Sequence, residues 1–289
     1  MPQPNFLPCD APIGAAVTGV DLALPPDPKA LDELERALEH YGVLIFPDQD
    51  ITPAQQIEFS RCFGFLEPTT VRDARLDDAP EILVVGNTGD QPVTFSPAAE
   101  GGELEWHSDH IHRPIPSRAS LLYALSVPDR GGDTLFACMY SAYAALPADE
   151  QARCDGLRVI NSDAGVRAWL ARQELAGSDA SRYDEPDLEV VHPLVRRHPL
   201  TGRKALSFGN QVSTGIVGWE RPAAARFIQK LTAHACAERF QYRHRWRKGD
   251  AVLWDNRRVL HAGTAYDLNG SPRLMHRTTI RETEALDET

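Results

Sequence analysis

The sequence predicts an α+β fold, because segments with helical periodicity lie near both ends and segments with strand character fill the middle. Its 289 residues are 42% hydrophobic and 25% charged, which is an ordinary composition for a protein with a large core. Length alone would allow two domains. Since no repeat or linker divides the chain, we expect residues 1–289 to form a single domain.

Two helices and a strand are expected in the first quarter of the chain. Between residues 27 and 41, apolar side chains recur at the three-and-four spacing of an amphipathic helix. Residues 43–46 are an unbroken apolar run, which is typical of a buried strand. Thr52 and Pro53 then supply an N-cap and a first-turn proline for a second helix, which Gly64 would end.

The rest of the chain alternates strands with turns before a last helix. Strands are expected at residues 81–85, 119–125 and 134–137, and a helix at residues 222–237. Residues 240–246 and 251–254 flank a Lys-Gly-Asp turn, and this pattern predicts a β-hairpin.

Residues 165–188 include a polar, turn-rich stretch. The pattern fits an active-site lid and fits equally a surface excursion without a role.

Charge and cysteine content narrow the functional classes. The formal net charge of −11 argues against a nucleic acid or an anionic membrane as partner. The basic run at residues 243–248 is interpreted as a solvated strand face for the same reason. The N-terminus has no secretory signal pattern, no apolar run reaches membrane-spanning length, and the five cysteines are scattered. We therefore expect a cytoplasmic protein with reduced thiols.

The segment Glu105-Trp106-His107-Ser108-Asp109 carries the most informative side chains. In an extended strand His107 and Asp109 would project to the same side, where both can bind one ion. His261 follows an apolar strand and a turn and supplies a third ligand. Two histidines and one carboxylate are the ligand set of non-haem Fe(II) oxygenases, which leaves positions open for a co-substrate. The same set with an open position would also suit a zinc hydrolase.

Two further segments fit a bound carboxylate co-substrate. In Gly131-Gly132-Asp133-Thr134 the glycines permit a close backbone approach and Thr134 can donate a hydrogen bond. Arg273 and Arg277 lie four positions apart, so in a strand both guanidinium groups would face the same way.

These segments, in their order, resemble the taurine dioxygenase and 2,4-dichlorophenoxyacetate dioxygenase (TauD/TfdA) family. The motifs that carry the resemblance are Trp-His-Ser-Asp, Gly-Gly-Asp-Thr, Trp-Asp-Asn-Arg-x-x-x-His and Arg-x-x-x-Arg-Thr-Thr, at residues 106–109, 131–134, 254–261 and 273–279. The resemblance implies a double-stranded β-helix (jelly-roll, cupin-like) core with flanking helices. It also implies a homodimer or homotetramer.

The resemblance assigns roles to named residues. His107, Asp109 and His261 would hold Fe(II), and Thr134 with Arg273 would bind the distal carboxylate of 2-oxoglutarate. Arg277 matches the arginine that faces the substrate's anion. The implied reaction consumes O₂ and 2-oxoglutarate and releases succinate and CO₂. It hydroxylates a small to medium carboxylate-bearing organic substrate, or hydroxylates it and then cleaves or further oxidises it.

Two positions depart from the taurine-binding pattern. A histidine expected in the loop at residues 65–69 is missing, and an asparagine expected four residues before His107 is Glu103. Taurine is therefore not the expected substrate, and Glu103 and His110 are candidate substrate contacts. Besides the zinc hydrolase, a non-catalytic jelly-roll binding protein remains an alternative.

Overall fold

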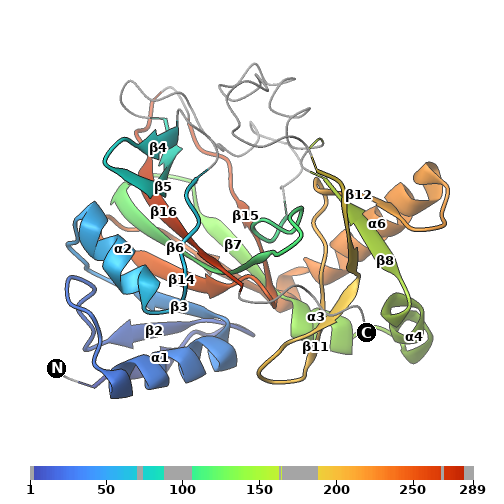
Figure 1. Cartoon of the computed structure of the whole chain (residues 1–289), viewed down its shortest axis with the longest axis horizontal. Helices are drawn as coiled ribbons and strands as arrows, with labels where there is room; N and C mark the ends of the chain where they lie inside the picture. Colours follow the sequence, from blue (N-terminus) through green and yellow to red (C-terminus); the bar gives the residue numbers. More distant parts are fainter. Residues whose placement is uncertain are drawn as a thin grey trace.

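The computed structural model describes residues 3–69, 74–87, 106–162, 164, 188–267 and 270–282. In this part of the chain, helices flank several sheets whose strands pair antiparallel, apart from the parallel pair of residues 15–18 and 43–46 (Figure 1). The predicted lid at residues 165–188 lies outside the described residues except for Leu188. No helix in the described ranges is long and apolar enough to cross a membrane.

The largest sheet has eight strands. Their order is β1 (Asn5–Pro8), β2 (Ala15–Thr18), β3 (Val43–Phe46), β14 (Ala251–Asp255), β6 (Ser117–Ser126), β16 (Leu274–Arg281), β5 (Ala79–Gly86) and β4 (Arg75–Leu76). A three-stranded sheet is ordered β13 (Gln241–His244), β7 (Thr134–Cys138) and β15 (Val259–Gly263). The smaller pairings are β12 (Ser213–Ile216) with β8 (Arg158–Asn161) and β9 (Val190–Pro193), and β10 (Val195–Arg197) with β11 (Lys204–Leu206). These sheets with their helices confirm the expected α+β, jelly-roll class.

Local capping explains where the first two helices begin. Helix α1 (Pro28–Tyr41) starts after Asp27, whose side chain accepts a hydrogen bond from the Ala30 N–H at 2.9 Å. Helix α2 (Pro53–Arg61) starts after Thr52, which forms a capping box with Gln55. Helices α3 (Met139–Ala144), α4 (Ala148–Asp155) and α6 (Arg221–Ala235) and the 3₁₀ turn η3 (Glu238–Phe240) complete the helical elements of the described residues.

The predicted hairpin at residues 240–254 is wrong. Strand β13 pairs with β7, whereas β14 pairs with β3 and β6, so the two strands belong to different sheets. Gly249 has a left-handed φ of 87°, and its N–H donates to Ala124 while its carbonyl accepts from Gln49. The turn is therefore bonded to the large sheet and its neighbouring loop, and it carries the chain from one sheet to the other.

Alternating side chains of the large sheet fill two cores. On one face Leu122, Trp254 and Met275 join a cluster with Phe136 of β7. The opposite face packs against α1 and α2, through the cluster Leu34, Leu38, Leu44, Phe46, Phe59, Leu121 and Leu253. Helix α1 lies against β3 and β14, and α2 lies against β5 and β16 (Figure 1).

The face toward β7 also carries polar side chains. Arg277 pairs with Leu122 and Thr279 pairs with Ser120 across β16 and β6. Since directly paired residues project to the same face, Ser120 and Arg277 point into the space between the two sheets.

Candidate functional site

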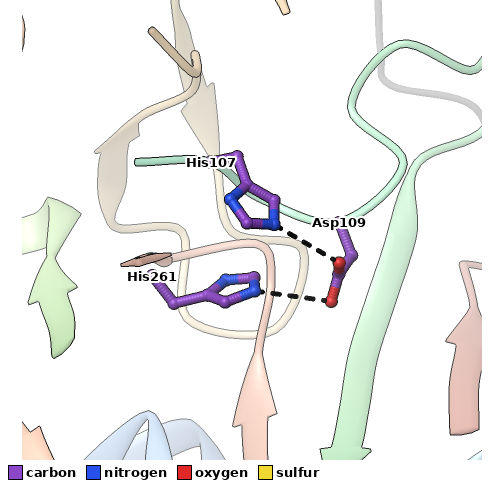
Figure 2. A group of neighbouring side chains, drawn as sticks. All are labelled: His107, Asp109 and His261. Carbon is purple, nitrogen blue, oxygen red and sulfur yellow. Dashed lines mark ion pairs between the residues drawn. The ribbon is translucent and has the colours of Figure 1, made fainter. Parts of the chain in front are cut away.

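His107, Asp109 and His261 come together at the edge of the three-stranded sheet. The backbone of His107 forms an isolated bridge with His261 of β15, in which His107 N donates to His261 O at 3.0 Å and His261 N donates to His107 O at 2.8 Å. One ligand atom from each of the three side chains lies within 4.8 Å of the others. Figure 2 shows both imidazole rings directed at the carboxylate of Asp109. Each Nε2 is 3.8 Å from one carboxylate oxygen.

The local backbone differs from the extended strand predicted for His107 and Asp109. Only His107 takes part in a β-bridge, and Asp109 and His110 lie in a turn. His110 has a left-handed φ of 54°, which is uncommon for a residue other than glycine. The two side chains converge because the bridge to His261 places one of them and the following turn places the other.

Burial and neighbouring charges set the protonation states of this cluster. Burial alone would raise the pKa of Asp109, but Arg277 and the two histidines hold it well below its ordinary range. Burial, reinforced by His107, lowers the pKa of His261 to about 3. At neutral pH the site therefore offers a carboxylate and a neutral imidazole, which are the forms that bind a metal.

Both carboxylate oxygens of Asp109 accept hydrogen bonds. Arg277 Nη1 donates to Oδ1 at 2.7 Å, and the Ser120 hydroxyl donates to Oδ2 at 2.6 Å. The bond of Arg277 to Asp109 is not evident from the motif, which predicts only a contact of Arg277 with a substrate anion. Ser120 was also missed, because a serine inside an apolar strand carries no recognisable motif.

The Gly-Gly-Asp-Thr segment lies close to Arg273. A Cβ on Gly132 would lie 3.5 Å from Arg273 Nε. A Cβ on Gly131 would lie 2.2 Å from the carbonyl oxygen of Ala265, so glycine is required for the approach of the neighbouring loop. The hydroxyl of Thr134 accepts a hydrogen bond from the indole N–H of Trp246 at 2.9 Å, and its own hydrogen can be donated elsewhere. Thr134 and Arg273 are both buried.

His110 is bonded to residues outside the predicted metal cluster. Its Nδ1 is 2.6 Å from the Glu67 carboxylate and 2.9 Å from the Ser117 hydroxyl. Glu67 also accepts a hydrogen bond from Arg113 at 3.1 Å. Both His110 contacts are made by Nδ1. Through this one ring nitrogen, His110 joins the loop after α2 to the turn that contains Asp109 and His110. Glu103 lies outside the described residues.

The donor set fits Fe(II). Two imidazoles and one carboxylate on one side of an ion make a facial triad, which leaves the other side open for a chelating co-substrate. The buried guanidinium of Arg273 beside Gly132 fits the distal carboxylate of such a co-substrate.

Comparison with known proteins identifies relatives along nearly the whole chain. A model of the family described as "Taurine catabolism dioxygenase TauD, TfdA family" matches residues 5–279. The (S)-phenoxypropionate/alpha-ketoglutarate-dioxygenase of Sphingobium herbicidovorans is 36% identical over 277 residues, which cover 95% of this chain and 94% of the relative. The alpha-ketoglutarate-dependent 2,4-dichlorophenoxyacetate dioxygenase of Cupriavidus pinatubonensis is 35% identical and covers 92% of this chain and 94% of the relative.

A solved structure shares the fold. The crystal structure of AAD-2 in complex with Mn(II) and N-oxalylglycine has a TM-score of 0.82 and 32% identity, and the match covers 99% of this chain and 100% of that one. The zinc hydrolase and the non-catalytic binding protein are not supported by these relatives. The chain belongs to the TauD, TfdA family and is an Fe(II)- and 2-oxoglutarate-dependent dioxygenase.

Proposed function

We propose that this dioxygenase hydroxylates an organic carboxylate of the aryloxyalkanoate type. The observation that carries the proposal is the cluster of His107, Asp109 and His261 in a chain that matches phenoxypropionate and 2,4-dichlorophenoxyacetate dioxygenases over nine-tenths of its length. The loss of both taurine-pattern residues, at the loop of residues 65–69 and at Glu103, agrees with a substrate other than taurine.

In this proposal His107, Asp109 and His261 hold the iron. When bound, Fe(II) with 2-oxoglutarate and O₂ supplies the oxidising chemistry and yields succinate and CO₂. The protein keeps Asp109 ionised through Arg277 and keeps His261 neutral through burial, so these two ligands need no proton loss at neutral pH. Arg273 and Thr134 bind the distal carboxylate of 2-oxoglutarate, because a buried dianion needs a paired cation and hydrogen-bond donors.

Arg277 has two roles in the proposal. Its Nη1 is bonded to Asp109, while its other N–H groups can bind the substrate carboxylate, since a guanidinium has five donors in a planar fork. The substrate anion would then be bound next to the iron ligand by the same side chain. Glu103 and His110 remain predicted substrate contacts.

An anaerobic titration followed by a substrate screen tests the function. Fe(II) and 2-oxoglutarate together should produce the visible charge-transfer absorption of the chelate. On admission of air, aryloxyalkanoates should give succinate and hydroxylated product. Terpenoid and aliphatic acids, amino acids and taurine should be assayed in parallel. Efficient turnover of taurine, or a neutral best substrate that Arg277→Ala does not affect, would contradict the proposal.

The cytoplasmic location and the homodimer or homotetramer also belong to the proposal. Cell fractionation checks the first, and light scattering of the purified protein checks the second.

A further inference from the structure

The carboxylate of Asp109 is held by a hydrogen bond on each oxygen. Ser120 donates to Oδ2 and Arg277 donates to Oδ1. Rotation of the carboxylate about its Cβ–Cγ bond would break both bonds. Because Asp109 and Ser120 are both almost fully buried, water cannot replace the lost partner without rearrangement.

Asn256 sets the direction in which the Ser120 hydroxyl points. Its side-chain oxygen accepts hydrogen bonds from the indole N–H of Trp254 at 2.9 Å and from the backbone N–H of Asp109 at 3.2 Å. Two donors at one end of the amide identify that end as the oxygen, so the amide nitrogen faces Ser120, at 3.0 Å. Since the Ser120 oxygen accepts from Asn256, its own hydrogen is available for Asp109.

Asn256 lies in a turn that buried ion pairs and hydrogen bonds of its neighbours hold in place. The neighbouring Asp255 accepts hydrogen bonds from Arg257 Nε at 2.8 Å and Nη2 at 2.8 Å, and its Oδ2 lies 2.9 Å from His198 Nε2. The backbone oxygen of Asn256 accepts from the Ser108 hydroxyl at 2.8 Å. These side chains are buried, so the turn that presents Asn256 is rigid.

We propose that Asn256 and Ser120 are positioning residues that orient the Asp109 carboxylate toward the metal. The hydrogen bonds run in one direction, from the Asn256 amide to the Ser120 hydroxyl and from there to Asp109 Oδ2. The inference rests on the proposed function, because it gives Asp109 the role of metal ligand. It adds that the metal affinity depends on two residues that do not touch the metal.

Mn(II) binding measured by electron paramagnetic resonance tests this arrangement without turnover. Ser120→Ala removes the donor to Oδ2, and we expect Mn(II) affinity to fall about 10-fold or more, as is typical when an outer partner of a metal ligand is lost. Ser60→Ala is the matched control, because Ser60 is equally buried and its hydroxyl pairs with Thr278 at 2.7 Å without contacting Asp109. The control should bind Mn(II) as the unaltered protein does, and both variants should unfold at similar urea concentrations.

A double variant tests the direction of the chain of hydrogen bonds. Asn256→Ala should weaken Mn(II) binding. In a Ser120→Ala background the same change should weaken it less than in the unaltered protein, because the part that acts through the Ser120 hydroxyl is already lost and only the bond from Asp109 N–H to the Asn256 oxygen remains to be removed. Additive losses would contradict this chain. If Asn256→Ala does not fold, the comparison of Ser120→Ala with Ser60→Ala decides alone.

The outcomes separate this inference from the function on which it rests. Failure of the unaltered protein to bind Mn(II) would contradict the proposed metal site itself. Normal binding by both the unaltered protein and Ser120→Ala would contradict only the positioning role.

Discussion

At the scale of single residues, the two arginines proposed to bind carboxylates, Arg273 and Arg277, have different surroundings. Arg277 is bonded to Asp109 and keeps that carboxyl ionised. Arg273 is almost fully buried, and burial lowers its pKa. The smaller, opposing effect comes from Tyr266, whose ring centre lies 5.8 Å from the guanidinium carbon. A buried guanidinium of this kind is strongly stabilised when an anion binds beside it. The two surroundings therefore agree with two different proposed contacts, 2-oxoglutarate for Arg273 and the substrate for Arg277.

Arg273→Ala should weaken 2-oxoglutarate binding and leave the substrate requirement nearly unchanged. Losing one partner of a buried charge pair costs about 3 to 5 kcal/mol, or about two to three decades of affinity. Steady-state kinetics with each substrate varied in turn measures the two KM values. Arg243→Ala is the control, because Arg243 is exposed and is paired with Asp133 next to Thr134. An unaltered KM for 2-oxoglutarate in Arg273→Ala would reject the role.

At the scale of elements, the Gly-Gly-Asp-Thr turn depends on close contact with the loop after β15. Gly131 and Gly132 have left-handed φ values of 72° and 66°. Gly132 N donates to Ala265 O at 3.2 Å, and Asp133 N donates to the Thr264 hydroxyl at 2.9 Å. These bonds hold the start of β7, and with it Thr134, against the loop that leads toward Arg273.

Gly131→Ala should disturb this contact, whereas Gly202→Ala should not. Both glycines have a left-handed φ, so each substitution costs about 1 to 2 kcal/mol of conformational strain. Only at Gly131 would the added Cβ meet a backbone oxygen, since nothing lies within 4 Å at Gly202. We therefore expect a raised KM for 2-oxoglutarate and lower stability in Gly131→Ala, measured by kinetics and urea unfolding. Equal behaviour of the two variants would show that the close approach does not matter.

At the scale of the whole molecule, buried titratable groups make stability depend on pH. Burial lowers the pKa of His276 to about 4, and this residue lies on the strand that also carries Arg277. It is not one of the proposed metal ligands. In the folded protein His276 is therefore neutral well below the pH at which an unfolded chain would protonate it.

The free energy of unfolding should fall as the pH drops from about 6.5 toward 4, and His276→Gln should reduce this fall. In that window the unfolded chain binds a proton that the folded protein does not bind, so acid favours unfolding. With pKa values of 6.5 and about 4, His276 alone accounts for about 2 kcal/mol between pH 7 and pH 5. Urea unfolding of the metal-free proteins at both pH values measures the difference. The same pH dependence in His276→Gln would contradict the assignment.

The beginnings of α1 and α2 could be predicted because they depend on neighbours in the chain. Asp27 bonds to Ala30, and Thr52 bonds to Gln55, so each cap lies within three residues of its partner. The strands β3, β5, β6 and β7 were also predicted at their observed positions within a few residues, from apolar runs and the turn residues between them. The short strands β8 to β12 were not predicted, because their alternating patterns are weak.

By itself, the sequence determined the helix starts, the buried strands and the three candidate ligand residues, since each is expressed in residue type and local spacing. Only the tertiary structure decided that β13 and β14 enter different sheets, that His107 pairs with His261, and that Ser120 and Asn256 reach Asp109. Asn256 and Asp109 lie 147 positions apart. An alternating pattern specifies which face of a strand is buried but not which strand lies beside it, so contacts at such separations arise from pairing and packing.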